Sequence, residues 1–160
     1  IVATGSSPNV PGFLKDAKDR LVINDDIFDW DDLPQSVAVF GPGIIGIELG
    51  QALSRLGVRV RMFGVSGSLG PIQDEDIREY ALKTFNVEFP LMASAKVHSV
   101  VRTDEGVSIR FDDSDGGKEV TETFDYLLAA TGRRPNVDGM DLQNAGIHLD
   151  DHGAPLFDPY

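Results

Sequence analysis

Cysteine is missing from this chain of 160 residues. Its absence excludes disulfides, thiolate metal sites and dithiol redox chemistry within these residues. The chain also lacks an apolar run long enough to span a bilayer, and it lacks the basic region and apolar core of a signal peptide. We therefore predict no membrane partner. We expect a cytoplasmic location, because nothing in the sequence requires an oxidising compartment.

Basic residues are scarce. The chain carries 14 Lys and Arg against 26 Asp and Glu, which gives a formal net charge of −12. Nucleic acids and anionic membranes make poor partners for such a chain, because their phosphates are repelled rather than neutralised. An anionic cofactor would have to be bound through local geometry and not through the overall electrostatic field.

The histidines and the acidic clusters do not have the spacing of metal ligands. His98, His148 and His152 are not spaced as a metal site and have no recognisable pattern of partner ligands around them. The acidic stretch from Asp112 to Asp115 lacks the ligand spacing of a calcium loop. We predict no metal site, and we interpret the acidic stretch as the solvated tip of a hairpin.

One strand–helix–strand unit stands out. Residues 36–40, SVAVF, form a continuous apolar run that is typical of a strand buried on both faces. Apolar residues then recur at helical spacing up to Leu56, and Gly57 suits the position after a helix end. Residues 58–63, VRVRMF, alternate in polarity and predict a second strand. This order is a βαβ unit of a parallel sheet.

The sequence signals for the other elements are weaker. We predict a strand at 1–3, an acidic and irregular linker at 13–35, a helix at 72–85, a short strand at 87–91 and a buried strand at 126–130. Three β-type runs at 94–102, 106–111 and 118–124 predict an antiparallel meander with a hairpin turn at 112–118. The tail from 137 is expected to be loop-like. The predicted fold is α/β, a Rossmann-like parallel sheet with helices and an inserted three-stranded antiparallel meander.

Three glycines follow the buried strand at the spacing of the dinucleotide fingerprint. Gly41 allows the tight turn, Gly43 lets a pyrophosphate approach the backbone, and Gly46 lets the helix pack closely on the sheet. The helix start offers unpaired N–H groups and the positive end of its dipole. A turn that binds nothing would explain the pattern less well, because Gly43 has no obvious packing need.

The choice between NAD and NADP stays open. An NAD site usually carries an acid at the end of the second strand, and an NADP site carries a nearby Arg. Here the strand ends in Met62, Phe63 and Gly64. Arg59 and Arg61 lie on the strand itself, and no Arg follows in the loop GVSGSLG. Ser66 and Ser68 could hydrogen-bond a ribose or a 2′-phosphate, or they could be ordinary loop residues.

Three segments together resemble a known family. GPGIIGIELGQALSRLG, LGPIQDEDI and YLLAATGRRPNVDGMDLQNAGI resemble the pyridine nucleotide–disulfide oxidoreductases, and dihydrolipoamide dehydrogenase most closely. The resemblance covers nearly the whole chain. It implies that nicotinamide stacks on FAD in a parent enzyme and that electrons pass between the flavin and a cysteine pair. Because the chain opens without Met, we expect a fragment of that parent.

The resemblance also implies a domain organisation. Residues 1–33 would be the edge of the FAD domain and a linker, 34–132 the NAD(P)-binding domain, and 133–160 the return towards the FAD domain. The FAD site, the cysteine pair and the C-terminal domain that forms a homodimer would lie outside the chain. NAD(P)H and the rest of the flavoenzyme would then be the partners, and the chain alone would be inactive, with no catalytic residue.

The family's nucleotide contacts can be carried over onto this sequence. Gly41, Pro42, Gly43, Ile44, Ile45, Gly46 and Glu48 would wrap the pyrophosphate and reach the nicotinamide. Glu48 would contact the carboxamide end, or simply complement the helix dipole. Gly64 stands where the family has its ribose-binding acid. Val97 would pack on the adenine or belong to the core, and Gly132 would contact the nicotinamide or only end a strand.

Two alternatives remain for the function. The chain could be a free-standing nucleotide-binding or regulatory module that never meets a flavin. It could also be a domain of a related flavoenzyme, such as glutathione reductase, mercuric reductase or an NADH oxidase.

Overall fold

The computed structural model describes residues 1–113 and 117–157, so the centre of the hairpin turn predicted at 112–118 lies outside the described residues. The strands are β1 (Ser6–Pro8), β2 (Leu21–Val22), β3 (Ser36–Phe40), β4 (Arg59–Phe63), β5 (Leu91–Met92), β6 (Val97–Thr103), β7 (Gly106–Asp112), β8 (Glu119–Phe124), β9 (Tyr126–Ala129) and β10 (Arg133–Pro135). The helices are α1 (Ile44–Arg55) and α2 (Glu75–Glu88), with 3-10 helices η1 (Gly12–Arg20), η2 (Asp26–Asp29) and η3 (Leu142–Ala145).

A five-stranded parallel sheet forms the centre of the molecule. Its strand order is β2-β9-β3-β4-β5, and β6, β7 and β8 form a separate antiparallel sheet. The apolar run at 36–40 becomes β3, which pairs with β4 on one side and β9 on the other, and every residue of it is buried. The predicted α/β class, with a parallel sheet and an inserted three-stranded meander, is confirmed.

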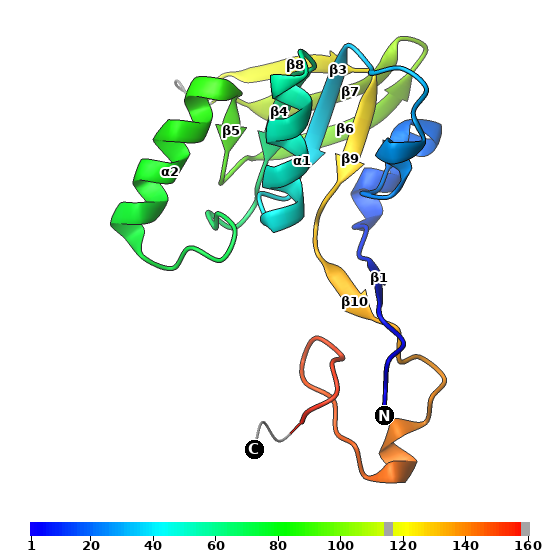
Figure 1. Cartoon of the computed structure of the whole chain (residues 1–160). Coiled ribbons are helices and arrows are strands. Elements are labelled where there is room, and N and C mark those ends of the chain that lie inside the picture. The colour runs from blue at the N-terminus through cyan, green and yellow to red at the C-terminus, as the bar shows by residue number, and fades with distance from the viewer. Residues whose placement is uncertain (114–116, 158–160) are drawn as a thin grey trace.

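The central sheet is covered on both faces (Figure 1). Strand alternation sends Val37 and Val39 to one face of β3 and Ala38 and Phe40 to the other. The first pair packs in a core with Leu53 of α1, and the second packs in a core with residues of the meander. The carboxyl ends of β3, β4 and β9 therefore lie between two layers, which is where α/β sheets bind ligands.

The two helices follow from local signals, with shifted bounds for the second. Gly57 has φ +93°, as expected for the glycine that follows a helix end. The helix predicted at 72–85 runs instead from Glu75 to Glu88, because the Asp74 carboxylate accepts a hydrogen bond from the Ile77 N–H (3.0 Å) and caps the helix there. The strand predicted at 87–91 is correspondingly wrong, and β5 begins only at Leu91.

The prediction of an irregular linker at 13–35 needs correction. Residues of η1 contribute Leu14 and Ala17 to the core, both fully buried, and β2 pairs in parallel with β9 at the edge of the central sheet. The two buried residues are separated by one turn of a 3-10 helix, and the acidic residues around them obscure this spacing in the sequence.

The strand predicted at 1–3 is also wrong. The first strand is β1, which pairs antiparallel with β10 from Ser6 to Pro8. This two-stranded ribbon leads from the main body to a small lobe that contains η3 and the N-terminus (Figure 1). The tail from 137 is mostly irregular, as expected, apart from η3 and a bridge between Leu149 and Pro155.

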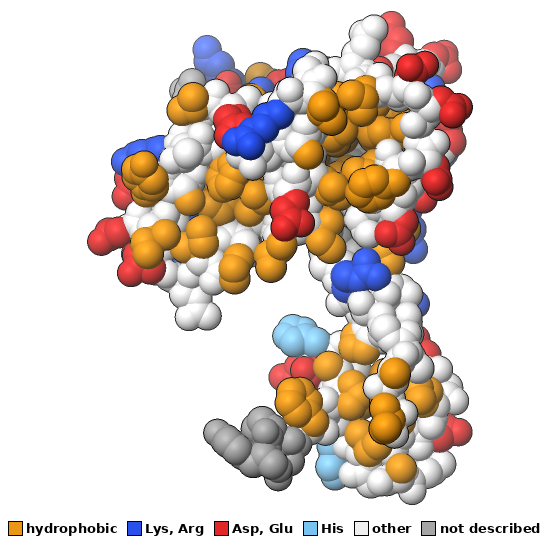
Figure 2. All heavy atoms as spheres, viewed as in Figure 1, with side chains coloured by type: hydrophobic (Ala, Val, Ile, Leu, Met, Phe, Trp, Pro, Cys, Tyr) orange, Lys and Arg blue, Asp and Glu red, His pale blue; other side chains and the backbone are white. Residues whose placement is uncertain are grey.

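Hydrophobic side chains are exposed around the helices and on the small lobe (Figure 2). On α2 they include Ile77, Tyr80 and Val87. No helix within residues 1–113 and 117–157 is both long and apolar enough to cross a bilayer.

Candidate functional site

The turn between β3 and α1 is built on contacts that exclude side chains. Gly41 has φ +104°, and a Cβ on it would lie 2.3 Å from the carbonyl oxygen of Ala130. Its N–H donates to the carbonyl oxygen of Phe63 (2.9 Å). The turn therefore fits between the ends of β4 and β9 only because residue 41 is a glycine.

Gly46 has a comparable role one turn into the helix. A Cβ there would lie 1.9 Å from the carbonyl oxygen of Gly41 and 3.3 Å from the Cβ of Ala130. The absence of a side chain lets the first turn of α1 approach the strand ends closely, which is the packing role that the fingerprint assigns to its third glycine.

Gly43 differs from both. A Cβ built on it would meet no heavy atom within 4 Å, and its φ of −78° is accessible to any residue. Packing among the described residues thus gives no reason for a glycine here. Gly43 is the N-cap residue of α1, it supplies no side-chain cap, and the first turn of α1 contains no acidic residue. The donors and the positive dipole end of the helix are left to an external acceptor.

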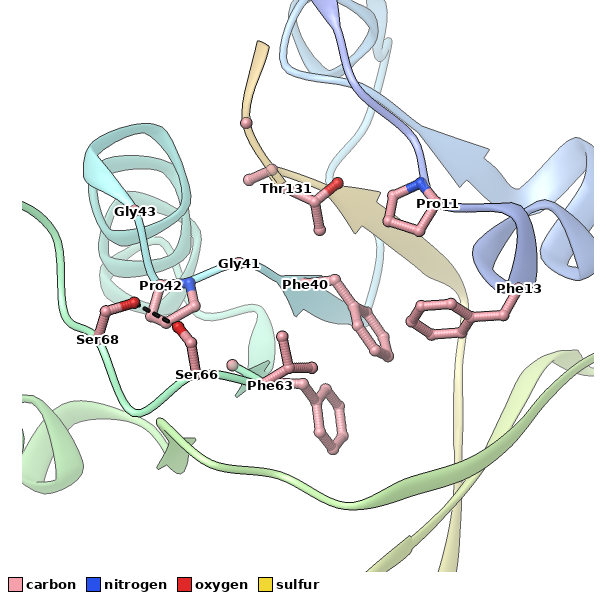
Figure 3. Close-up of a pocket in the computed structure, with 14 residues that line it drawn as sticks. Pro11, Phe13, Phe40, Gly41, Pro42, Gly43, Phe63, Ser66, Ser68 and Thr131 are labelled. Atoms are coloured by element: carbon pink, nitrogen blue, oxygen red, sulfur yellow. Dashed lines mark hydrogen bonds between the residues drawn. The ribbon is translucent and has the colours of Figure 1, made fainter. Parts of the chain in front are cut away.

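A cavity of about 310 Å³ opens beside this turn. It is lined by Pro11, Phe13, Phe40, Gly41, Pro42, Gly43, Phe63, Gly64, Val65, Ser66, Ser68, Ala130, Thr131 and Gly132. Figure 3 shows Pro11 and Phe13 on one side of it and the loop from Gly41 to Gly43 on the other. The rings of Phe13 and Phe40 meet edge to face, with centroids 6.0 Å apart.

The sequence did not predict the contribution of Pro11 and Phe13. Both belong to a segment interpreted as a turn and linker, and the only signal for them was two apolar residues, separated by Gly12, at the beginning of that segment. They join the cavity because η1 packs on the meander face of the central sheet.

A second cavity of about 320 Å³ lies on the α1 side of the same turn. It is lined by Pro8, Asn24, Gly43, Ile44, Ile45, Ala129, Ala130, Gly132 and Arg133. The two cavities share Gly43, Ala130 and Gly132. They therefore flank the glycine turn from two sides, and a ligand lying across the N-terminus of α1 could reach both.

Hydrogen bonds hold the cationic residue of the second cavity in place. The Arg133 guanidinium donates to the Ser6 side-chain oxygen (2.8 Å), to the Ser6 carbonyl oxygen (2.6 Å) and to the side-chain oxygen of Asn24 (3.3 Å). All three acceptors are neutral, so the positive charge of Arg133 is not cancelled by a carboxylate in these contacts.

The predicted site residues are brought together only in part. The loop from Gly41 to Ile45 lines the two cavities, and so do Gly64 and Gly132. Gly46 lies directly beneath the turn. Glu48 is exposed in the second turn of α1, outside the lining of either cavity, and its side chain makes no hydrogen bond or ion pair with any described residue. Val97 packs against the core between the sheets and lines neither cavity.

Gly64, the residue that follows β4, is a glycine for a steric reason. A Cβ on it would lie 2.6 Å from the carbonyl oxygen of Ala93 and 2.7 Å from Cγ of Pro42. The Gly64 N–H donates to the carbonyl oxygen of Met92 (2.7 Å), which holds this backbone against the neighbouring strand. A carboxylate side chain at position 64 would have no room to leave the backbone.

The position of α1 relative to α2 is fixed by a polar cluster at the far end of the helix. The Glu88 carboxylate accepts two hydrogen bonds from the Arg55 guanidinium (2.7 and 2.8 Å) and one from the side-chain amide of Gln51 (2.7 Å). The Arg55 guanidinium chiefly, and the Gln51 amide to a smaller extent, hold the pKa of Glu88 below its usual value.

Away from the cavities, one acidic side chain of the antiparallel sheet is held by two neighbouring side chains. The Asp112 carboxylate contacts His98 Nε2 (2.5 Å) and Lys96 Nζ (3.0 Å), and hydrogen bonds from His98 and then Lys96 lower the pKa of Asp112. Within the described residues there is no group of three or more His, Cys, Asp or Glu side chains that could hold a metal ion.

The chain resembles known proteins along its whole length. Dihydrolipoyl dehydrogenase 1, mitochondrial, from Arabidopsis thaliana is 31% identical over 158 residues, which cover 98% of this chain and 31% of that protein. Dihydrolipoamide dehydrogenase from Chaetomium thermophilum is 33% identical over 163 residues, which cover 99% of this chain and 32% of that protein. The chain therefore spans about a third of the length of these relatives.

Solved structures share the fold. LpdA from Mycobacterium tuberculosis matches with a TM-score of 0.73 and 28% identity, over 94% of this chain and 32% of that one. The HOCl-induced flavoprotein disulfide reductase RclA from Escherichia coli matches with a TM-score of 0.77 and 23% identity, over 98% of this chain and 35% of that one. The second likeness supports the fold alone.

The family model described as pyridine nucleotide-disulphide oxidoreductase matches residues 1–160. The resemblance inferred from the three sequence segments is thus confirmed, and the relatives are oxidoreductases by name. The chain belongs to the pyridine nucleotide-disulphide oxidoreductase family.

Proposed function

We propose that this chain binds NAD(H) or NADP(H), with the pyrophosphate against the loop from Gly41 to Gly43, as the nucleotide-binding domain of a flavoprotein disulfide oxidoreductase of the dihydrolipoamide dehydrogenase type. One observation carries the proposal. Gly43 caps a helix that has no acid in its first turn, and the space around its Cα is open. A glycine that packing does not require is explained if a ligand approaches the backbone there.

The local electrostatics favour an anion at this point in spite of the overall charge. The net charge of −12 repels phosphates at long range. The N-terminus of α1 concentrates unpaired N–H donors and the positive dipole end within one turn. Anion binding by these groups works at contact distance, where the protein's distant carboxylates are screened by solvent and salt.

The two cavities fit the two halves of a dinucleotide. We assign the adenosine half to the cavity that contains Gly64, Ser66 and Ser68, because it lies beyond the end of β4. The nicotinamide half belongs to the cavity formed by Ile44, Ile45, Gly132 and Arg133, because it lies beyond the end of β9. In this arrangement Gly43 is the shared wall at which the pyrophosphate crosses.

When bound, the reduced nicotinamide would supply a hydride that a flavin can accept, and the oxidised nicotinamide would accept one from a reduced flavin. The residues of this chain would bind and orient the nicotinamide: Ile44 and Ile45 provide apolar contact, and Arg133 provides hydrogen-bond donors and positive charge. Glu48 and Val97 keep the roles carried over from the family as part of the proposal, Glu48 towards the carboxamide end and Val97 towards the adenine.

The remaining chemistry would come from other parts of a longer parent enzyme. The chain contains no cysteine, so the cysteine pair that exchanges electrons with a disulfide cannot be among these residues. We propose that FAD, the cysteine pair and a homodimer interface are supplied by the rest of the flavoenzyme, and that the chain alone turns over no disulfide substrate.

Calorimetric titration of the purified chain with NADH and with NADPH tests the proposal. We expect saturable binding of at least one of them, and competition by the non-reducible fragment ADP-ribose, which carries the same pyrophosphate. Absence of binding by both nucleotides at millimolar concentration would overturn the proposed site.

A further inference from the structure

The cavity beyond β4 is electrically neutral. Of the 14 residues drawn around it in Figure 3, none carries a charged side chain. A carboxylate in this place would repel a 2′-phosphate on the adenosine ribose, and an Arg would attract one. This cavity therefore contains neither of the two charges by which dinucleotide sites usually separate NAD from NADP.

Steric crowding at Gly64, on the wall of the cavity, explains why no acid is present there. The ring of Pro42 and the carbonyl oxygen of Ala93 both lie under 3 Å from where a Cβ on Gly64 would be. Position 64 cannot present an acid as long as those two groups are there. The first side chains beyond β4 that can meet a ribose come from the following loop, where Val65, Ser66 and Ser68 line the cavity.

Two hydroxyl groups face each other in that loop. The side-chain oxygens of Ser66 and Ser68 are 2.7 Å apart and share a hydrogen bond (Figure 3). Both side chains are exposed, so each keeps a lone pair or a proton available on the cavity side. A hydroxyl can accept from a ribose 2′-OH and can donate to a phosphate oxygen, so the pair suits either cofactor.

We propose that Ser66 and Ser68 read the 2′-position of the adenosine ribose, and that the site therefore accepts NADH and NADPH with affinities within about tenfold of each other. This inference rests on the proposed function, since it assigns the adenosine end of that same site. The net charge of −12 repels the additional phosphate, so NADH binds more tightly at low ionic strength. The ratio of the two affinities approaches one as salt is added.

The test is a pair of fluorescence titrations of the chain, with NADH and with NADPH, at low and high salt. Ser66→Asp and Ser66→Arg add opposite charges to an exposed loop residue, so both variants should fold. We expect Ser66→Asp to lower the affinity for NADPH by about tenfold or more and the affinity for NADH by less than about threefold. We expect Ser66→Arg to raise the affinity for NADPH selectively, by about tenfold. Thr84 is exposed on α2 outside both cavities, so Thr84→Asp and Thr84→Arg are the matched controls. Each should change the affinities for NADH and NADPH by the same factor.

The outcomes separate this inference from the proposed function. Two results would overturn the neutral-site inference and leave the nucleotide site intact. One is a wild-type ratio of NADH to NADPH affinity above about tenfold in either direction at high salt. The other is a change of both affinities by the same factor in the Ser66 variants. Loss of all binding in the wild-type chain would instead remove the proposed function, and this inference with it.

Discussion

The ring of Pro42 lies beside Gly64, with its Cγ 2.7 Å from the point that a Cβ on Gly64 would occupy. Pro42 is the second residue of the glycine turn, and Gly64 is the residue that follows β4. Their contact links the shape of the turn to the wall of the cavity where we propose that the ribose binds, because the Pro42 ring leaves no room for a side chain at position 64.

Gly64→Ala should destabilise the chain. The new methyl group would clash with the Pro42 ring and with the carbonyl oxygen of Ala93, which is backbone and cannot rotate away. We expect a loss of about 1–3 kcal/mol in the free energy of unfolding, as for other overpacked sites. Chemical denaturation measures it, and the prediction is wrong if the midpoint is unchanged.

Gly43→Val should weaken nucleotide binding and leave stability nearly unchanged. Its Cβ has open space around it, so we expect a change in stability within about 1 kcal/mol, reflecting only the poorer N-cap. Nucleotide affinity should fall by about tenfold or more, because the side chain would stand between the backbone donors and the pyrophosphate. Binding is measured by calorimetry, and stability by thermal unfolding.

Gly12→Val provides the matched control for that variant. Gly12 also has no heavy atom within 4 Å of its Cβ position, and it does not line either cavity. It should leave nucleotide affinity nearly unchanged. Equal affinity in Gly43→Val and in the wild type would disprove the pyrophosphate contact.

Two glycines four residues apart in α1 should respond differently to alanine. In Gly46→Ala the new Cβ would meet the carbonyl oxygen of Gly41, and we expect a loss of about 3 kcal/mol or more. In Gly50→Ala the nearest atom is Cε of Met62 at 2.8 Å, the end of a flexible side chain. Its displacement should offset the gain of about 1 kcal/mol in helix propensity, and the net change should stay within about 1 kcal/mol. Similar losses in the two variants, by urea denaturation, would contradict this distinction.

The cluster around Glu88 should make stability depend on pH. Because Arg55 and Gln51 lower the pKa of Glu88 in the folded chain, its ionised carboxylate stabilises the fold. This stabilisation is complete above the pKa of Glu88 in the unfolded chain, about 4.3. It is lost as the pH falls through the lower pKa of Glu88 in the folded chain.

Glu88→Gln tests the cluster, since it keeps the shape and removes the charge. We expect a lower unfolding temperature than wild type at pH 7, with the difference shrinking below pH 4 as the wild-type carboxyl becomes protonated. High salt should reduce the difference at pH 7. A difference that stays constant from pH 7 to pH 3 would show that the charge is not responsible.

Much of the central unit could be predicted from the sequence because its signals are local. The apolar run at 36–40 predicts a strand buried on both faces, and β3 is buried at every residue. The spacing of Gly41, Gly43 and Gly46 predicts a tight turn into a closely packed helix, and the clashes that a Cβ would cause at Gly41 and Gly46 agree with it. Such features depend on backbone dihedrals and on neighbours within a few residues.

The segments at 1–35 were predicted less well. Leu14 and Ala17 are buried against strands that lie more than 80 residues further along the chain, including β6 and β7. No local periodicity records a contact of that kind. The strand pairing of β1 depends in the same way on β10, which the turn after β9 brings alongside it.

What the sequence determined by itself is the strand–turn–helix unit, and with it the position at which we propose that a diphosphate meets bare backbone. Only the tertiary structure decided the surroundings of that position: Phe13 at one wall of the cavity, Ala93 and Pro42 beside Gly64, and Ser66 facing Ser68. The reason is that steric exclusion acts between groups that are close in space. Residues 42, 64 and 93 are brought together only when three parallel strands end at the same edge of the sheet.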